Sequence, residues 1–109
     1  MSGELLEAEN LLKVLSYQKK TVVSRTILEK KTGTVTVFAF DRGEGLSEHM
    51  SPFEALVVIL EGKAEISLGQ QCYVLKKGDF LVLPAKKPHK VGAVERMKML
   101  LVMVRSRDK

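Results

Sequence analysis

Two histidines, His49 and His89, are the residues of this chain best suited to chemistry at neutral pH. An imidazole can donate or accept a hydrogen bond, change its charge near neutral pH, or ligate a metal ion. Neutral imidazoles would hydrogen-bond a small polar molecule, and a protonated one would pair with a carboxylate. Ser51, two residues after His49, adds a hydroxyl that can donate or accept. The alternative is that both histidines are inert and are hydrogen-bonded within a core.

Other patterns that carry chemistry are missing from the sequence. It contains no arrangement of serine, histidine and acid typical of hydrolases, no phosphate-binding glycine loop and no CxxC pair. The single cysteine, Cys72, excludes an internal disulfide framework. The N-terminus is acidic and does not resemble a signal peptide. These features predict a cytoplasmic protein.

The charge distribution argues against two classes of partner. The formal net charge is +5, but the lysines occur as scattered pairs near predicted turns, and tryptophan is absent. Nucleic-acid binding favours a concentrated basic face, so we expect no nucleic-acid partner. No apolar run approaches the roughly 18 residues that would cross a bilayer, so we expect no membrane partner. Lys86, Lys87 and Lys90 border His89 and could attract an anionic ligand.

Short strands dominate the predicted secondary structure. Stretches rich in β-branched residues are separated by turn signals every eight to twelve residues, which is typical of an all-β sandwich or barrel. Residues 41–45 are predicted to form a loop. The expected strands are 21–28, 34–40, 54–61, 63–68, 71–75, 80–83, 89–94 and 96–105.

The N-terminal segment has a different pattern. Leu5, Ala8, Leu12 and Leu15 recur at helical spacing, which predicts an amphipathic α-helix of about three turns over residues 4–16. Ser2 is a suitable N-cap for it. The chain of 109 residues is therefore divided into a helical segment, residues 1–18, and a single barrel domain, residues 19–109.

Two predicted strands are apolar on both faces. Residues 55–60 are an unbroken apolar run, and residues 97–104 are apolar on both sides except for Lys98. An antiparallel strand with one wet face should alternate between apolar and polar residues. We therefore expect these strands to be covered on the outside, by the N-terminal helix or by a second subunit, and we expect a homodimer.

Residues 33–104 resemble the cupin superfamily, which is marked by two motifs. In the first, G-x₅-H-x-H-x₃₋₄-E-x₆-G, this chain has Gly43, His49 and Gly62. In the second, G-x₅-P-x-G-x₂-H-x₃-N, it has Gly78, Pro84 and His89. The motif positions that differ are Ser51 for the second histidine, Ala55 for the glutamate, Lys86 for the glycine and Ala93 for the asparagine.

The resemblance implies a double-stranded β-helix, the jelly-roll barrel of cupins. In metal-binding members of the family, three histidines and one glutamate hold a divalent ion such as iron, manganese, nickel, zinc or copper. This sequence keeps only His49 and His89 of those four ligands. Ser51 is a poor ligand when neutral, and Ala55 offers none. One divalent transition metal is therefore a possible cofactor. The expectation that the protein has no cofactor is nearly as plausible.

A third ligand could come from elsewhere in the chain. Glu54 is one residue from the usual glutamate position, so regular pleating would turn it away unless a β-bulge near Pro52 brought it inward. Cys72 lies on a different predicted strand and is more typical of a small buried apolar residue. The methionines of residues 97–103 are better explained as core packing than as copper ligands.

Three functions follow from these residues, and whether the chain is an enzyme stays open. The first is binding of a small molecule, which could be anionic, at His49, Ser51 and His89. The second is a metal-dependent dioxygenase, isomerase or decarboxylase with an altered ligand set. The third is a structural dimerisation module whose barrel is packed shut by Phe40, Phe53, Phe80 and the methionines.

Overall fold

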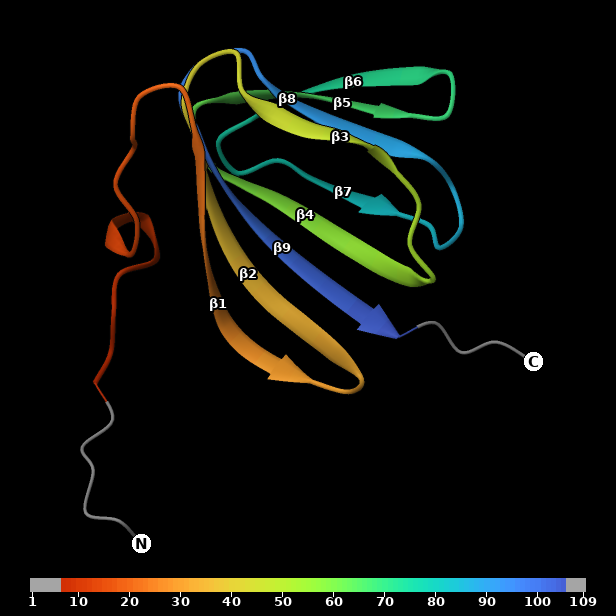
Figure 1. Ribbon diagram of the computed structural model, residues 1–109, viewed down its shortest axis with the longest axis horizontal. Helices are drawn as coiled ribbons and strands as arrows, with labels where there is room; N and C mark the ends of the chain where they lie inside the picture. The colour runs from red at the N-terminus through yellow and green to blue at the C-terminus, as the bar shows by residue number, and fades with distance from the viewer. Residues whose placement is uncertain (1–6, 106–109) are drawn as a thin grey trace, which may run out of the picture.

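A computed structural model describes residues 7–105 of the chain, and these residues form nine β-strands and one short 3₁₀-helix (Figure 1). The all-β prediction is confirmed. No helix among the described residues is long and apolar enough to span a membrane. In chain order the elements are η1 (Leu11–Lys13), β1 (Val22–Lys30), β2 (Gly33–Phe40), β3 (Gly45–His49), β4 (Phe53–Glu61), β5 (Lys63–Leu68), β6 (Gln71–Lys76), β7 (Phe80–Leu83), β8 (His89–Ala93) and β9 (Met97–Arg105).

The strands are arranged in two sheets that face each other. The large sheet has the order β1-β2-β9-β4-β7, and the small sheet has the order β3-β8-β5-β6. All neighbouring strands pair antiparallel. The two layers lie one above the other in Figure 1 and meet where β4 continues into β5. This is the jelly-roll barrel that the motifs implied.

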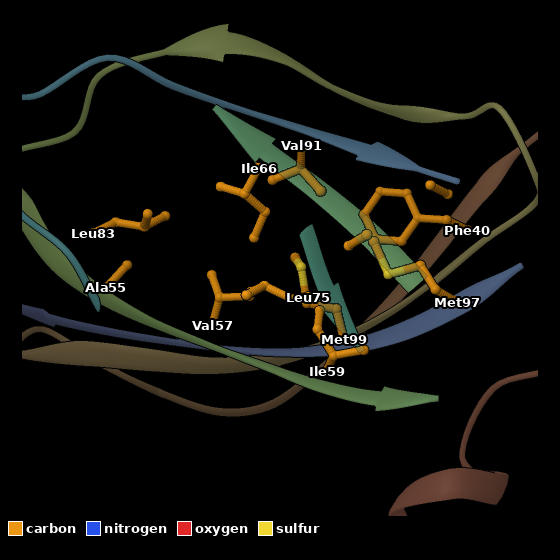
Figure 2. Packing of buried hydrophobic residues seen from close by; sticks show 12 residues of the cluster. Phe40, Ala55, Val57, Ile59, Ile66, Leu75, Leu83, Val91, Met97 and Met99 are labelled. Carbon is orange, nitrogen blue, oxygen red and sulfur yellow. The ribbon is translucent and has the colours of Figure 1, made fainter. Parts of the chain in front are cut away.

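The core fills the space between the two sheets. Along β4, alternate residues Ala55, Val57 and Ile59 are buried, as pleating requires of a strand with one inward face. Side chains from both layers point toward one another in Figure 2. The buried apolar cluster comprises Phe40, Ala55, Val57, Ile59, Ala64, Ile66, Leu75, Leu83, Val91, Ala93, Met97 and Met99.

Gly62 allows the chain to pass from one sheet to the other. Its φ is +83°, a left-handed conformation that favours glycine. A Cβ at this position would lie 2.7 Å from the Cβ of Met97 and would also strike the Arg96 carbonyl. The motif glycine is therefore required both by its backbone conformation and by the close approach of the chain where β9 begins.

The predicted strands are largely confirmed, with one omission. Residues 41–45 were expected to be a loop, but the loop ends at Glu44 and Gly45–His49 form β3. This strand has few β-branched or aromatic residues, and most of its side chains are exposed, so it gave no propensity signal. Its place in the sheet depends on pairing with β8, which the local sequence does not reveal.

The N-terminal α-helix prediction is wrong for the part of the chain that the structure describes. Residues 7–10 are irregular, and only Leu11–Lys13 form a single 3₁₀ turn; Ser2 and Leu5 lie outside the described residues. The Asn10 side chain accepts a hydrogen bond from the Leu12 amide, which starts a new turn in the middle of the expected helix. Isolated short helices are marginal, and here contacts with the sheet compete successfully.

The segment Asn10–Tyr17 lies instead against the outer face of the large sheet. The Tyr17 hydroxyl donates to a Glu61 carboxylate oxygen at 2.6 Å, and Arg96 and Lys98 both lie over its ring. The Lys98 ammonium also donates to the Leu12 carbonyl oxygen, which explains how a lysine on β9 can be almost fully buried. Burial and the Glu61 carboxylate raise the pKa of Tyr17 far above its ordinary value.

Asp41 ties the chain that follows this segment to the barrel. Its carboxylate accepts hydrogen bonds from the Lys20 amide, the Arg42 amide and the Arg96 guanidinium. The bond from Arg96 is the main cause that lowers the pKa of Asp41 to about 2. The turn before β1 is therefore fixed to the loop after β2 and to the start of β9.

Candidate functional site

The two histidines predicted to form the site are brought together by paired strands. His49 ends β3, His89 begins β8, and the two residues are direct partners in the antiparallel register. A register irregularity between Leu46 and His49 precedes this pairing. The Nε2 atoms lie 3.0 Å apart, and the ring centroids are 4.3 Å apart with the planes at 71°. The irregularity thus immediately precedes the residue whose imidazole faces that of His89.

The two imidazoles differ in burial. His89 is 8% exposed, whereas His49 is exposed to solvent. They lie at the end of the barrel where β3 ends and β4 and β8 begin (Figure 1). The site is therefore reached from outside through His49, with His89 behind it.

Distances to backbone carbonyls indicate which nitrogens carry protons. His49 Nδ1 lies 2.8 Å from the Ser47 carbonyl oxygen, a normal hydrogen-bond length, so this nitrogen is the donor. Its Nε2 is then an acceptor when the ring is neutral. The corresponding distance from His89 Nδ1 to the Lys87 carbonyl oxygen is 3.3 Å, which is longer than is usual for a hydrogen bond. In the neutral pair, His89 Nε2–H can donate to His49 Nε2, and His89 Nδ1 is then an acceptor that faces the Lys87 carbonyl oxygen without a donor.

The environment favours a neutral His89. Burial lowers the pKa of this imidazole, and the neighbouring His49 lowers it further. Below its ordinary pKa of 6.5, His89 therefore resists the proton that a solvent-exposed histidine would take up. At neutral pH the neutral His89 therefore faces His49 through a single Nε2–Nε2 contact.

Ser51 is close along the chain but is used in the architecture. Its hydroxyl accepts a hydrogen bond from the Phe53 amide at 3.0 Å, and its carbonyl accepts one from the Lys86 amide at 2.7 Å. β3 ends at His49, so strand alternation does not extend to Ser51. The residue joins the β3–β4 connection to the loop before His89, and its hydroxyl hydrogen stays available to a ligand.

The backbone of Lys86 has a conformation that the sequence does not reveal. It takes the place of the motif glycine and yet has a φ of +64°, which glycine adopts readily and a lysine adopts rarely. The chain therefore keeps the backbone conformation of the motif although the residue has changed. A bend held in this way beside His89 is typical of functional loops.

The structure does not bring Glu54 to the histidines. Glu54 is exposed on β4, and its neighbour Ala55 faces the core, so the carboxylate is directed to the outer face. The pairing of β4 with β9 is regular from Phe53 to Ile59, and the register shifts only after Ile59, far from Pro52. No group of three or more His, Cys, Asp or Glu side chains suitable for a metal ion occurs within residues 7–105.

Cys72 lies on β6, whereas the two histidines lie on β3 and β8. The sequence suggested a small buried apolar residue, but the thiol is exposed on β6 and donates to Glu65 at 3.1 Å. This carboxylate raises the pKa of Cys72. A thiol with a raised pKa is a weak metal ligand and a weak nucleophile.

These residues do not match the complete ligand set of the family's metal centre. Two imidazole nitrogens converge, but the positions of the first motif's second histidine and of its glutamate hold Ser51 and Ala55. A metal held only by these two side chains would depend on solvent or on a bound molecule for its other ligands.

Comparisons with known proteins agree with the fold and the motifs. Residues 36–104 match the cupin domain model. A conserved Streptococcus pyogenes protein of unknown function is 35% identical, with a TM-score of 0.89 over 96% of this chain and 92% of that chain. A cupin 2 conserved barrel domain protein from Leptotrichia buccalis is 37% identical, with a TM-score of 0.84 over 88% of this chain and 47% of that chain. A cupin superfamily protein from Desulfitobacterium hafniense is 26% identical, with a TM-score of 0.88.

A two-layer β-barrel with paired motif histidines defines a small single-barrel protein of the jelly-roll class. This chain belongs to the cupin family. No match was found among curated proteins, so the family membership fixes the fold and leaves the activity to the site itself.

Proposed function

We propose that this cupin binds a small polar molecule at the His49–His89 pair. The observation that supports this most strongly is the 3.0 Å approach of the two Nε2 atoms, from residues at the end of β3 and the start of β8. A ligand that both donates and accepts can replace this single hydrogen bond with one bond to each ring. The Ser51 hydroxyl is the third polar group that we assign to the ligand.

The packing limits where such a ligand can lie. Phe40, Met97 and Met99 are fully or almost fully buried within the core cluster, so side chains occupy the interior between the sheets. The ligand therefore lies at the end of the barrel against His49 and does not enter the middle. A ligand in this position must be small and remains partly exposed to solvent.

An anionic ligand stays a prediction, and its pH dependence has a definite sign. A carboxylate pairs with a protonated imidazole, and burial makes His89 resist protonation. The resistance of His89 to protonation weakens anion binding. Lys87 and Lys90, which are exposed on either side of His89, favour anion binding through their positive charge. Binding of an anion such as acetate should therefore strengthen as the pH falls below 6.5, the ordinary pKa of histidine.

The proposal is tested by screening small polar molecules against wild type, His49→Ala and His89→Ala by ligand-observed NMR. We expect binders whose affinity is reduced by about fivefold to thirtyfold in both variants, since each variant loses one of two polar contacts of about 1–2 kcal/mol. Cys72→Ala, which changes an exposed side chain on another strand, is the matched control and should bind as wild type does. Binding that survives in both histidine variants would place the ligand elsewhere.

A metal-dependent enzyme is the second candidate, and the convergence of two Nε2 atoms favours it. Cupins often bind a divalent metal. Here His49 and His89 would be its protein ligands. The measurement is elemental analysis of protein purified without a metal-affinity tag. About one transition metal per chain, lost in both His→Ala variants, would support it. A metal content that is unchanged in either variant would reject these ligands.

The structural-module alternative gains partial support from the core. Phe40 and the methionines of β9 are packed in the interior, as that function requires. Phe53 is only half-buried, and Phe80 is 64% exposed on the outside of β7, so it does not close the barrel. A closed interior is equally compatible with a ligand at the barrel end. Binding measurements on the histidine variants therefore distinguish the two functions.

A further inference from the structure

The outer face of the large sheet is apolar over most of its width. Strand registers place side chains of β1, β2, β9, β4 and β7 in rows across this face, opposite to the core. One such row is Leu28, Val35, Val102, Leu56 and Val82. An antiparallel sheet facing water should present polar residues here. We call this surface the outer face, and its apolar residues indicate that it is covered by another part of the chain or by a partner.

The chain itself covers only one half of the outer face. The segment Asn10–Tyr17 lies against the half that contains Lys98. The other half, toward the β1–β2 turn, keeps Leu28 and Val104 each 53% exposed. A groove of about 270 Å³ lies there, lined by Leu28, Lys30, Thr32, Gly33, Thr34, Val35, Val102, Met103 and Val104.

Charges flank this uncovered half in a symmetrical way. The next row of the outer face reads Lys30 on β1, Gly33 on β2, Val104 on β9 and Glu54 on β4. A cation and an anion thus stand at equal distances on the two sides of the line between β2 and β9. Between them lie a position with no side chain and an exposed valine. A Cβ at Gly33 would strike the Met103 carbonyl, so no side chain can fill that position.

We propose that two copies of this chain pack through the uncovered half of the outer face, about a two-fold axis parallel to the strands and lying between β2 and β9. The symmetry then sets Lys30 of each copy opposite Glu54 of the other. It also sets Val104 of each copy opposite the Gly33 position of the other. In the neighbouring row, Leu28 faces Leu56, and Val35 faces Val102. Two sheets packed face to face at about 10 Å bury such rows against each other.

The occupant is a second copy because the face complements itself. Moving the axis by half a strand spacing, onto β9, would set Glu54 opposite Gly33 and leave Lys30 without a carboxylate opposite it. Moving it onto β4 would set the two Glu54 carboxylates against each other, which is unfavourable. The axis between β2 and β9 pairs both charges and matches apolar residues with apolar residues. An isologous interface requires this match of a surface with itself.

Sedimentation equilibrium at micromolar concentration tests the proposal with single and paired substitutions. Wild type should be dimeric, and Val104→Asp should be monomeric. Lys30→Glu and Glu54→Lys should each weaken the dimer by about tenfold or more, because the two-fold repeats each repulsion. The double variant Lys30→Glu/Glu54→Lys should recover the wild-type association within a few-fold, because the charges are exchanged and the pairs are restored.

Val74→Asp is the matched control, since Val74 is 57% exposed on β6 of the small sheet and outside the proposed interface. It should remain dimeric, and circular dichroism should show all variants folded. A monomeric wild type, or a dimer that Val104→Asp leaves intact, would overturn the interface. A double variant as weak as the single variants would overturn the axis.

Discussion

At the scale of single residues, the site depends on an inequality between two histidines. His49 is exposed and held by the Ser47 carbonyl, whereas His89 is buried behind it. The exposed ring can exchange partners at low cost because water can replace each hydrogen bond that it loses. The buried ring cannot, so its polar atoms must be satisfied by the Lys87 carbonyl oxygen, by His49 or by a ligand. His89 should therefore be the more sensitive of the two to substitution.

The lowered pKa of His89 predicts that wild type loses stability in acid. In the interval between the folded pKa and 6.5, the unfolded chain binds more protons than the folded chain. The free energy of unfolding therefore decreases as the pH falls below 6.5, and this decrease ends once the folded pKa is passed. Urea unfolding midpoints between about pH 5 and pH 8 should show this decrease in wild type and less of it in His89→Gln.

The matched variant for this measurement is His49→Gln, which keeps His89 buried. Since burial is the larger cause of the lowered pKa, most of the pH dependence should persist in this variant. Equal pH profiles for wild type and His89→Gln would show that the imidazole of His89 titrates as it does in the unfolded chain.

At the scale of elements, the N-terminal segment is held by polar contacts more than by a helical stripe. Tyr17 lies at the centre, where its hydroxyl bonds to Glu61 and its ring lies beneath the cations of Arg96 and Lys98. Each cation also has an oxygen partner, the Asp41 carboxylate for Arg96 and the Leu12 carbonyl for Lys98. The segment is thus fixed to β9 and to the β4–β5 turn at several points.

Tyr17→Phe should destabilise the fold by about 1–2 kcal/mol, because a half-buried hydrogen bond to a carboxylate is lost while the ring and its cation contacts remain. The measurement is the shift of the urea midpoint at neutral pH. Tyr73→Phe is the control, since the Tyr73 hydroxyl bonds only to the nearby, exposed Gln71 side chain. A shift no larger than that of the control would mean that the Glu61 bond contributes nothing to stability.

The sequence predicts the strands well and the N-terminal segment poorly, for physical reasons. Alternation such as that of Ala55, Val57 and Ile59 reports burial directly, so β4 was evident. The leucines of residues 4–16 indicate only that apolar groups need cover. They do not reveal that Tyr17 finds Glu61, 44 residues away, which fixes the segment in an extended path. β3 was missed because its pairing partner β8 follows forty residues later.

The site was predictable in its members but not in its geometry. The two motifs identified His49 and His89, and the structure pairs them. The 3.0 Å distance occurs next to a register irregularity before His49, and no local pattern in residues 45–49 indicates that irregularity. The expected side-chain direction of Glu54 followed from regular pleating alone. The fate of Ser51 did not, because it rests on contacts with the loop before His89.

At the scale of the whole molecule, the two proposals concern two separate surfaces. The end of the barrel carries the histidine pair, whereas the outer face of the large sheet carries the apolar rows and the Lys30 and Glu54 charges. These surfaces lie on different elements, so association of two copies and binding of a small molecule can be changed independently. Substitutions in one of these surfaces therefore serve as controls for the other.

The position of β9 also determines when the large sheet can be completed during synthesis. β9 is the last strand along the chain, yet it lies in the middle of the large sheet, between β2 and β4 (Figure 1). While it is still inside the ribosome, β1–β2 and β4–β7 are separate pairs whose facing edges are open. Open apolar edges recruit other chains. We therefore expect the nascent protein to be vulnerable to aggregation until Met97–Arg105 emerge and pair with both β2 and β4.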